Sequence, residues 1–299
     1  MSQSTAMLTY NAVGNREDLL DVITNISPTE TPMFSSFGKT KAKDTYHEWL
    51  TDSLATATSN SNIEGADYSF SARSPRTRKG NYTQIFVTPV EVSDTQRAVN
   101  AAGIEDEYAY QMAKALKEHA RDIEYALCST AAGSSGASGT ARTLKGVLAW
   151  ITSVNETGTA TGNESLTEDM FNDALQDIWD NGGTPDTAYA NGYQKRQIGT
   201  FTDSATKFVQ ATSEKEMLAG VDVYDSDFGR IKIKKSRFMP ADTVAILQTD
   251  LWKVAVLRPT QSEEVAKVGD ATRGVVKTEL TLEARNEAGS GKITQLSTS

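Results

Sequence analysis

The chain has 299 residues, a formal net charge of −9 and an apolar fraction of 38%. This length allows one large domain or two ordinary ones, and the acidic balance argues against tight nucleic-acid binding over the whole surface. The single cysteine, Cys128, cannot form an internal disulfide, so the fold does not depend on an oxidising compartment. No apolar run is long enough for a transmembrane helix, and the N-terminus lacks the pattern of a secretory signal, so we expect a cytoplasmic origin and no membrane.

The N-terminal residues predict an arm that needs a partner. Residues 1–14 have no periodicity and are expected to be extended, whereas Asn15 is a good N-cap for a short helix that ends before Pro28. Its apolar face would carry Leu19, Leu20 and Ile23. Because a helix of about ten residues is unstable alone, this face is predicted to anchor the arm on the body or on a neighbouring subunit.

Residues 45–97 predict a long two-stranded ribbon. Residues 45–50 and 81–88 are rich in β-forming residues, and about half of the residues between them are Ser, Thr, Asn or Gly. Pro89 confines the end of the returning strand to an edge or a bulge. A two-stranded ribbon is marginal in water without a further partner. We therefore expect it to pack on another copy of the chain.

Four cations gather at the end of this ribbon in an otherwise acidic chain: Arg73, Arg76, Arg78 and Lys79. They are compatible with a solvated loop, or with a patch that docks on an acidic surface of a neighbouring copy. Contact with nucleic acid is a third reading, although no aromatic residues alternate with the cations as base stacking would require.

A long amphipathic helix is predicted over residues 104–127, about 35 Å in length. Its apolar stripe comprises Ile104, Tyr108, Met112, Ala115, Leu116, Ile123 and Leu127. The glycine-rich run 133–139 that follows predicts a flexible loop.

The second half of the chain predicts an α/β lobe followed by antiparallel strands. Ser165 and Glu168 match a capping box at the start of a helix that ends at 181–183. The predicted core face of this helix includes Trp179. A buried strand over 187–190 and a helix over 192–201 follow. Three hairpins are then expected, pairing 221–225 with 230–235, 244–247 with 252–257, and 274–283 with 292–296. Helices and antiparallel strands are segregated, which is typical of the α+β class.

Catalytic and metal-binding patterns are not found in the sequence. His119 and Cys128 would lie about 13 Å apart along one helix, too far for a nucleophile and its base. Zinc-ligand spacing and glycine-rich phosphate loops are missing. Asp169, Asp173 and Asp177 fit a solvated acidic face better than a cation site. We predict that the protein is not an enzyme and carries no cofactor or metal.

The order of these elements, together with two local sequences, resembles a known family. The sequences are Asn15-Arg-Glu-Asp-Leu-Leu-Asp-Val-Ile-Thr24 with Pro28-Thr-Glu-Thr-Pro32, and Glu279-Leu-Thr-Leu-Glu-Ala-Arg-Asn-Glu287. They are similar to the N-arm and the C-terminal strand of major capsid (major head) proteins of tailed bacteriophages, which have the Hong Kong 97-type fold. The resemblance implies an N-arm (1–44), an E-loop ribbon (45–97), a P-domain with the spine helix (98–140), an A-domain (141–250) and C-terminal P-domain strands (251–299).

This resemblance implies a virion protein, made in a bacterial host, that self-assembles into hexamers and pentamers. These would close into an icosahedral or prolate shell around double-stranded DNA, with a separate scaffolding protein, a portal protein and in some relatives a decoration protein as partners. Arg73, Arg76, Arg78 and Lys79, and the arm residues Leu19, Leu20 and Ile23, are the expected inter-subunit contacts. The alternatives are an encapsulin-like compartment shell, or a β-rich adhesin or binding module.

Overall fold

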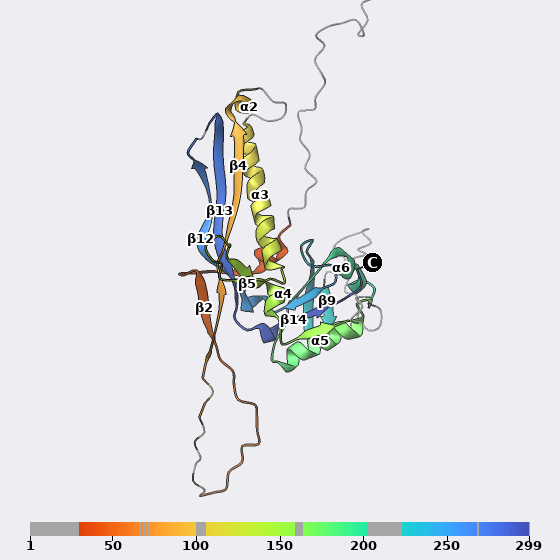
Figure 1. The fold of residues 1–299 in the computed structure, drawn as a ribbon. Helices are drawn as coiled ribbons and strands as arrows, with labels where there is room; N and C mark the ends of the chain where they lie inside the picture. The colour runs from red at the N-terminus through yellow and green to blue at the C-terminus, as the bar shows by residue number, and fades with distance from the viewer. Residues whose placement is uncertain are drawn as a thin grey trace, which may run out of the picture.

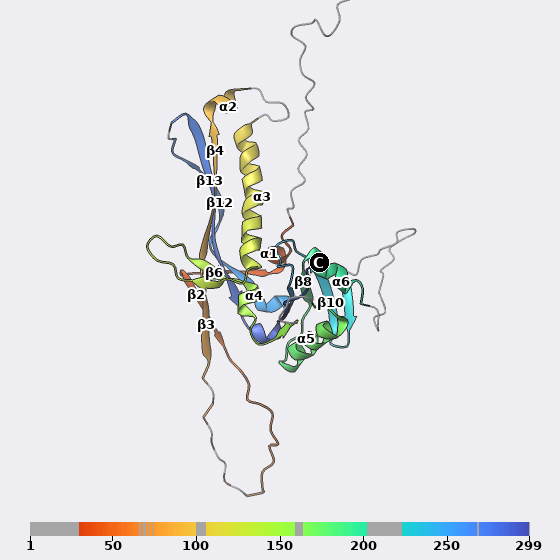
Figure 2. The same ribbon diagram turned by 45° about the vertical axis from the view of Figure 1, so that its right-hand side comes forward.

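The computed structural model describes residues 30–65, 67, 70, 72–73, 75–99, 106–158, 164–201, 223–267 and 269–298. These residues form an elongated part, in which a long helix lies along a narrow sheet, and a lobe built on a second sheet (Figure 1). A two-stranded ribbon and its connecting loop project beyond both (Figure 2). The predicted arm residues Leu19, Leu20 and Ile23 lie outside the described residues.

The elongated part is a four-stranded sheet in the order β1-β12-β13-β4. Its strands are β1 (Gly38–Lys41), β12 (Trp252–Val265), β13 (Ala271–Ala284) and β4 (Gln84–Ser93). β1 runs parallel to β12, and the other pairs are antiparallel. β4 is one of the two edge strands, which confirms the edge position predicted from Pro89. The short helix α2 (Asp94–Ala98) follows it and is capped by Ser93.

The predicted spine helix is α3 (Glu107–Leu127), which packs along β4 and β13. Ile104 of the predicted stripe lies outside the described residues. Asp106 begins it by accepting a hydrogen bond from the backbone N–H of Tyr108. The predicted stripe is wrong at Leu116, which is exposed, and it omits His119 and Glu124, which are buried. Leu116 is turned about 100° from Ala115, so the two cannot both face the sheet. His119 is accommodated because it finds polar partners there.

The lobe contains a six-stranded sheet in the order β7-β14-β11-β8-β10-β9. Its strands are β7 (Asn155–Thr157), β14 (Gly291–Thr294), β11 (Val244–Leu247), β8 (Thr187–Ala190), β10 (Gly229–Lys235) and β9 (Val223–Ser226). Helices α5 (Glu168–Asp180) and α6 (Gly192–Ile198) pack against it. The buried strand at 187–190 and the hairpin of β9 with β10 are confirmed.

Two of the three predicted hairpins are wrong. β11 pairs with β8 and β14, whereas β12 belongs to the other sheet, and the 3-10 turn η2 (Thr249–Leu251) carries the chain between them. Likewise β13 pairs with β12 and β4, and β14 pairs with β11 and β7 after the turn η3 (Glu287–Gly289). All four β11 residues are buried, which suits a central strand rather than a surface hairpin.

The α5 helix and its end at 181–183 are confirmed, whereas the predicted N-cap and the predicted burial of Trp179 are wrong. Thr167, not Ser165, is its N-cap, because its side chain accepts a hydrogen bond from the backbone N–H of Met170. Beyond the C-cap, Gly182 takes a positive φ of 81°, the conformation that glycine tolerates best. Trp179, predicted in the core, is 58% exposed.

The ribbon is β2 (Tyr46–Thr51) paired with β3 (Thr77–Tyr82), so the predicted return strand is divided at Thr83. Beyond Thr83 the chain enters the four-stranded sheet as β4. The glycine-rich run is not a simple loop: its first two residues belong to β5 (Ala132–Ser134), which pairs with β6 (Thr143–Lys145), and the remainder lies in the turn of this hairpin. Two short helices, α1 (Pro32–Ser36) and α4 (Val147–Trp150), complete the described elements.

Two hydrophobic clusters hold these elements together. The first joins the two sheets to α1 and the C-terminal end of α3 through residues such as Met33, Leu127 and Trp252. The second lies beneath α5 and includes Phe171 and Ile231. Each face of the six-stranded sheet therefore contributes to a different cluster, which fixes the lobe against the elongated part.

Candidate inter-subunit surfaces

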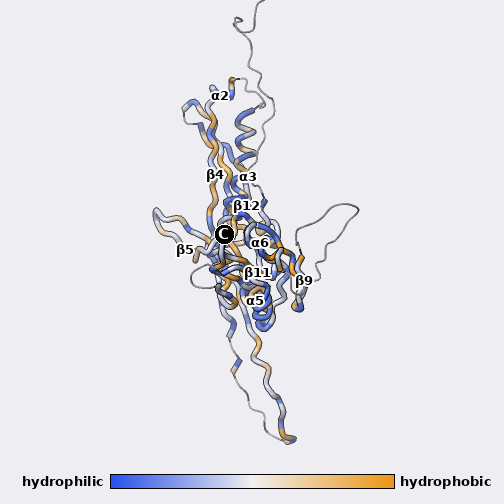
Figure 3. The backbone as a smooth tube through the Cα atoms, turned by 90° about the vertical axis from the view of Figure 1, so that its right-hand side faces the viewer, coloured by the Kyte–Doolittle hydropathy of each residue, from blue (hydrophilic) through white to orange (hydrophobic). Residues whose placement is uncertain are grey.

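The loop beyond the ribbon presents apolar side chains to solvent. Leu54 is 99% exposed, Phe70 96% and Ile63 84%, and no other large apolar side chain in the described part of the chain is as exposed. Figure 3 shows hydrophobic segments on this projecting loop. Isolated exposed apolar residues are common, but three on one projecting arm indicate a surface that another molecule covers. These apolar residues in an otherwise polar loop are visible in the sequence, but the sequence-based prediction of a contact surface used only the nearby cations.

The four predicted cations are not all at the end of the ribbon: Arg78 and Lys79 lie within β3, opposite Leu50 and Trp49, whereas Arg73 and Arg76 precede that strand. Arg73, Arg76 and Arg78 are exposed, and Lys79 is half-buried. Arg78 lies 3.2 Å from Glu48 (Nε to Oε1), and Arg76 lies 3.7 Å from Asp52 (Nε to Oδ2). Exposed pairs of this kind contribute about 0–1 kcal/mol, so neither arginine is firmly held by its own chain. Their contact with another copy stays a prediction.

Close packing at Gly80 shapes the ribbon near its base. A Cβ there would lie 2.7 Å from the Tyr46 ring, so a larger residue would displace that ring. The Tyr46 ring also packs on Tyr82, with 4.6 Å between ring centroids. Glycine at this position lets an aromatic pair cover the strand.

Asn81 ties the base of the ribbon to two other elements. Its buried side chain donates to the backbone oxygens of Lys145 (3.1 Å) and Leu282 (2.9 Å), and accepts from the backbone N–H of Lys145 (2.8 Å). One amide thus joins β3 to β6 and β13. Such a fully used buried amide fixes a single geometry.

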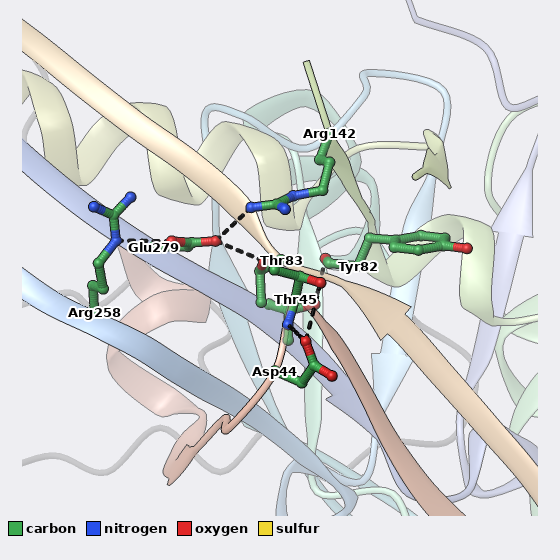
Figure 4. Close-up of polar contacts among 8 residues, drawn as sticks. Asp44, Thr45, Tyr82, Thr83, Arg142, Arg258 and Glu279 are labelled. Carbon is green, nitrogen blue, oxygen red and sulfur yellow. Dashed lines mark hydrogen bonds and ion pairs between the residues drawn. The ribbon is translucent and has the colours of Figure 1, made fainter. Parts of the chain in front are cut away.

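Glu279 on β13 forms the centre of a second network (Figure 4). It accepts from Thr83 Oγ1 (2.8 Å) and Arg142 Nη2 (2.7 Å) at one oxygen, and from Arg258 Nε (2.8 Å) at the other. The carboxylate is buried and the arginines are partly exposed. Charge-assisted bonds from both sides compensate for removing this carboxylate from water.

Glu283, four residues further along β13, has a similar set of partners. It accepts from Thr40 Oγ1 (3.0 Å) and Arg285 Nε (2.8 Å), and lies 3.2 Å from His47 Nε2 in the ribbon. Burial alone would raise the pKa of Glu283, but hydrogen bonds from Arg285, His47 and Thr40 outweigh it and hold the pKa below its ordinary value. This carboxylate is therefore ionised in the folded protein at neutral pH.

The network residues share one face of β13. Side chains alternate along a strand, so Glu279, Thr281 and Glu283 point to the ribbon side, and Thr281 Oγ1 donates to the Tyr82 oxygen at 2.8 Å. The intervening Leu280 and Leu282 face the core. The alternation Glu-Leu-Thr-Leu-Glu was visible in the sequence, although its partners were not. The arrangement is suited to setting the direction in which the ribbon leaves the body.

The remaining candidates for chemistry are structural. His119 lies between the hydroxyls of Thr88 (3.0 Å) and Thr278 (2.8 Å), away from Cys128, whose thiol is buried. Burial raises the pKa of this thiol, which disfavours the reactive thiolate. Among the described residues, no cluster of three possible ligands could hold a metal ion. Nor is any helix within those residues long and apolar enough to cross a membrane.

Comparison with known proteins gives consistent matches over the whole chain. The family model described as the SU10 major capsid protein matches residues 3–297. The major capsid protein of Escherichia phage Phieco32 is 25% identical in an alignment 342 residues long, gaps included, that covers 97% of this chain and 97% of that protein. A capsid chain of a native GTA particle gives a TM-score of 0.70 at 13% identity, covering 99% of this chain and 100% of that chain.

A chain of the holo-SrpI encapsulin complex from Synechococcus elongatus PCC 7942 gives a TM-score of 0.60 at 9% identity, covering 95% of this chain and 93% of that one. At such identities these structural likenesses establish the fold, and the predicted α+β Hong Kong 97-type architecture is confirmed. The family match decides between the sequence-based alternatives, because it spans nearly the whole chain. The chain belongs to the SU10 major capsid protein family: it is a self-associating structural protein of the phage head and virion capsid, not an enzyme.

Proposed function

We propose that the chain forms hexamers and pentamers that close into an icosahedral or prolate shell around double-stranded DNA. The observation that carries this proposal is the ribbon, whose loop exposes Leu54, Ile63 and Phe70 almost completely. A free subunit leaves these side chains in water, whereas a neighbour in a shell would bury them. The same heterologous contact, repeated around each capsomer, closes a ring.

In this arrangement the ribbon lies across a neighbouring subunit. The β13 network sets its direction, the apolar loop supplies most of the buried area, and Arg73, Arg76, Arg78 and Lys79 contact an acidic surface of the neighbour. Leu19, Leu20 and Ile23 anchor the N-arm on another subunit. Residues 1–44 serve as the arm, 45–97 as the E-loop, 98–140 and 251–299 as the P-domain, and 141–250 as the A-domain at the capsomer centre.

Further partners follow from the same role. A separate scaffolding protein would set shell size, a portal protein would occupy one vertex, and a decoration protein would bind outside. The packaged DNA would be enclosed without sequence recognition. The net charge of −9 supports weak rather than tight contact with phosphate over the inner surface.

Assembly can be tested on the full chain, expressed alone and with its scaffolding protein, by sizing and electron microscopy. Shells, tubes or ring-shaped capsomers are expected in at least one condition. Phe70→Ser should reduce assembly while leaving the far-UV circular dichroism and the melting temperature of the subunit unchanged. Val265→Ser, which alters an exposed apolar side chain on β12, is the matched control.

Changing all four cations to Glu tests the basic patch in the same assay. Loss of shells with an intact subunit would support the patch, and normal shells would refute it. A subunit that stays monomeric with its scaffolding protein present would overturn the proposed assembly itself.

A further inference from the structure

The start of the described chain is held by a buried carboxylate of another helix. Glu124, near the C-terminal end of α3, is fully buried. Its Oε1 accepts from the backbone N–H of Met33 (2.9 Å) and its Oε2 from that of Phe34 (2.8 Å), both in α1. Thr31, the N-cap residue of α1, makes no capping bond through its own side chain. Glu124 therefore supplies the cap that the local sequence does not.

The carboxylate has polar neighbours but no ion pair within the described residues. Besides α1, it is close to the Cys128 thiol (3.9 Å) and interacts with the Ser236 hydroxyl. Burial raises the pKa of Glu124, and the hydrogen bonds from Phe34 and Met33 offset only part of that rise. Removing an ionised carboxylate from water without a cation is unfavourable, so the docked arrangement binds a proton more readily than a hydrated carboxylate does.

Other titratable groups around the seat of α1 belong to several elements. Cys128 is the C-cap residue of α3, and Tyr189 of β8 interacts electrostatically with Glu124. Lys234 of β10 donates to Ser36 Oγ at 2.6 Å, and Lys39 lies 4.5 Å from the centroid of the Phe34 ring. Both lysines contact residues 34–36 rather than the carboxylate. Glu30, Lys195 and Lys235 line a surface pocket together with Pro32 and Ser35. Among all of these groups, Glu124 is the carboxylate that accepts hydrogen bonds from the backbone of α1, so its protonation acts directly on the docking of this helix.

We propose that α1 and Glu124 form a proton-controlled latch, which fixes the chain at residues 32–36 on α3 and loosens when the carboxylate loses its proton. Acid favours the docked state, because the released carboxylate is hydrated and titrates near its ordinary value of 4.5. The stabilisation of the docked state by the bound proton is complete below that value, and it is lost as the pH rises through the higher pKa of the docked state. Each unit between the two pKa values changes the docking equilibrium tenfold.

The latch matters because only residues 30 and 31 separate residues 1–29 from α1. Loosening α1 would free the root of the N-arm while the sheets and α3 remain folded. The use of this motion in shell assembly rests on the proposed function. The latch itself is a property of the single subunit, so its failure can be distinguished from a failure of assembly.

The chain contains its own reporter of latch opening. Cys128 is the only cysteine, is fully buried, and has its Sγ 3.7 Å from Met33 Sδ beneath α1. Its labelling by 4,4′-dithiodipyridine can be followed in the full-length subunit from acid to neutral pH. Dividing each rate by the rate for the urea-unfolded chain at the same pH removes the intrinsic titration of the thiol.

We expect the corrected rate to rise with pH, by up to tenfold per pH unit, and then to level off. Glu124→Gln should remove this pH dependence, because the amide cannot ionise. Glu118→Gln, which neutralises a partly exposed carboxylate on the same helix, should behave like the wild type. Met33→Ala should raise the rate at every pH, which verifies that the thiol reports on α1.

A pH-independent rate in the wild type would overturn the latch, as would a Glu124→Gln variant that keeps the wild-type profile. Hydrogen exchange of the Met33 and Phe34 amides in the wild type provides a second measurement that needs no variant. After correction for chemical exchange, their protection should fall as the pH rises while that of α5 remains constant. Constant protection of both segments would also refute the proposal.

Discussion

The network around Glu279 allows a quantitative test of how the ribbon is held. Glu279→Gln keeps the size of the side chain but removes its charge, so Arg142 and Arg258 lose a carboxylate partner. Breaking a buried charge pair costs about 3–5 kcal/mol when both partners are buried. Here the arginine side chains are 28% and 54% exposed, so water compensates for part of the loss. We expect the free energy of unfolding to fall by about 2–3 kcal/mol.

Urea unfolding of the soluble subunit, followed by far-UV circular dichroism, measures this change, provided that the denaturant dependence stays the same. Glu263→Gln is the matched control, because Glu263 pairs with Lys277 at 2.8 Å on the surface, where about 0–1 kcal/mol is expected. A double-mutant cycle with Arg142→Gln should give a coupling energy above about 1 kcal/mol. If Glu279→Gln destabilises no more than Glu263→Gln, the network does not hold the ribbon and the reasoning fails.

Four further substitutions address other parts of the fold. Asn81→Ala should lower the free energy of unfolding by about 2–3 kcal/mol, because it leaves buried backbone groups unpaired; a loss below about 0.5 kcal/mol in urea unfolding would contradict this. Burial lowers the pKa of His119, so neutral His119 contributes fully to the free energy of unfolding above the ordinary pKa of 6.5. This contribution is lost as the pH falls through the lower pKa of the folded state. His119→Gln should remove this pH dependence of stability, and an unchanged dependence would refute the assignment. Leu175→Ala beneath α5 should cost about 2–5 kcal/mol in thermal unfolding, whereas Trp179→Ala, largely exposed, should cost under about 1.5 kcal/mol; equal losses would place Trp179 in the core after all.

The sequence predicted local structure better than strand partners. Helix α5 and the hairpin of β9 with β10 could be identified because caps and turns act over a few residues. The partners of β11 and β14 could not, because an apolar strand such as Val244–Leu247 fits any central position in a sheet. Neighbours in the chain were therefore paired where the fold pairs distant segments.

The buried polar sites show a similar limit. Glu124 has the ordinary appearance of a helix residue, and its partners in α1 lie about ninety positions earlier in the chain. Only the docking of α1 makes it a cap. The exposed residues of the ribbon loop were readable without any structure, since a polar loop has no interior in which to place Leu54 or Phe70. The sequence thus indicated which residues need a partner more clearly than which residues provide one.

The position of β13 has a mechanical consequence. The ribbon strand β3 continues through Thr83 into β4, and hydrogen bonds at Asn81, Tyr82 and Thr83 also attach it to β13, which is bonded on both sides, to β12 and to β4. Antiparallel hydrogen bonds lie perpendicular to their strands, so tension along β13 is shared by many of them at once. A force on the ribbon is therefore distributed over the sheet and α3. Force in one subunit would reach its neighbour as a rigid displacement of this part, without separation of an edge strand.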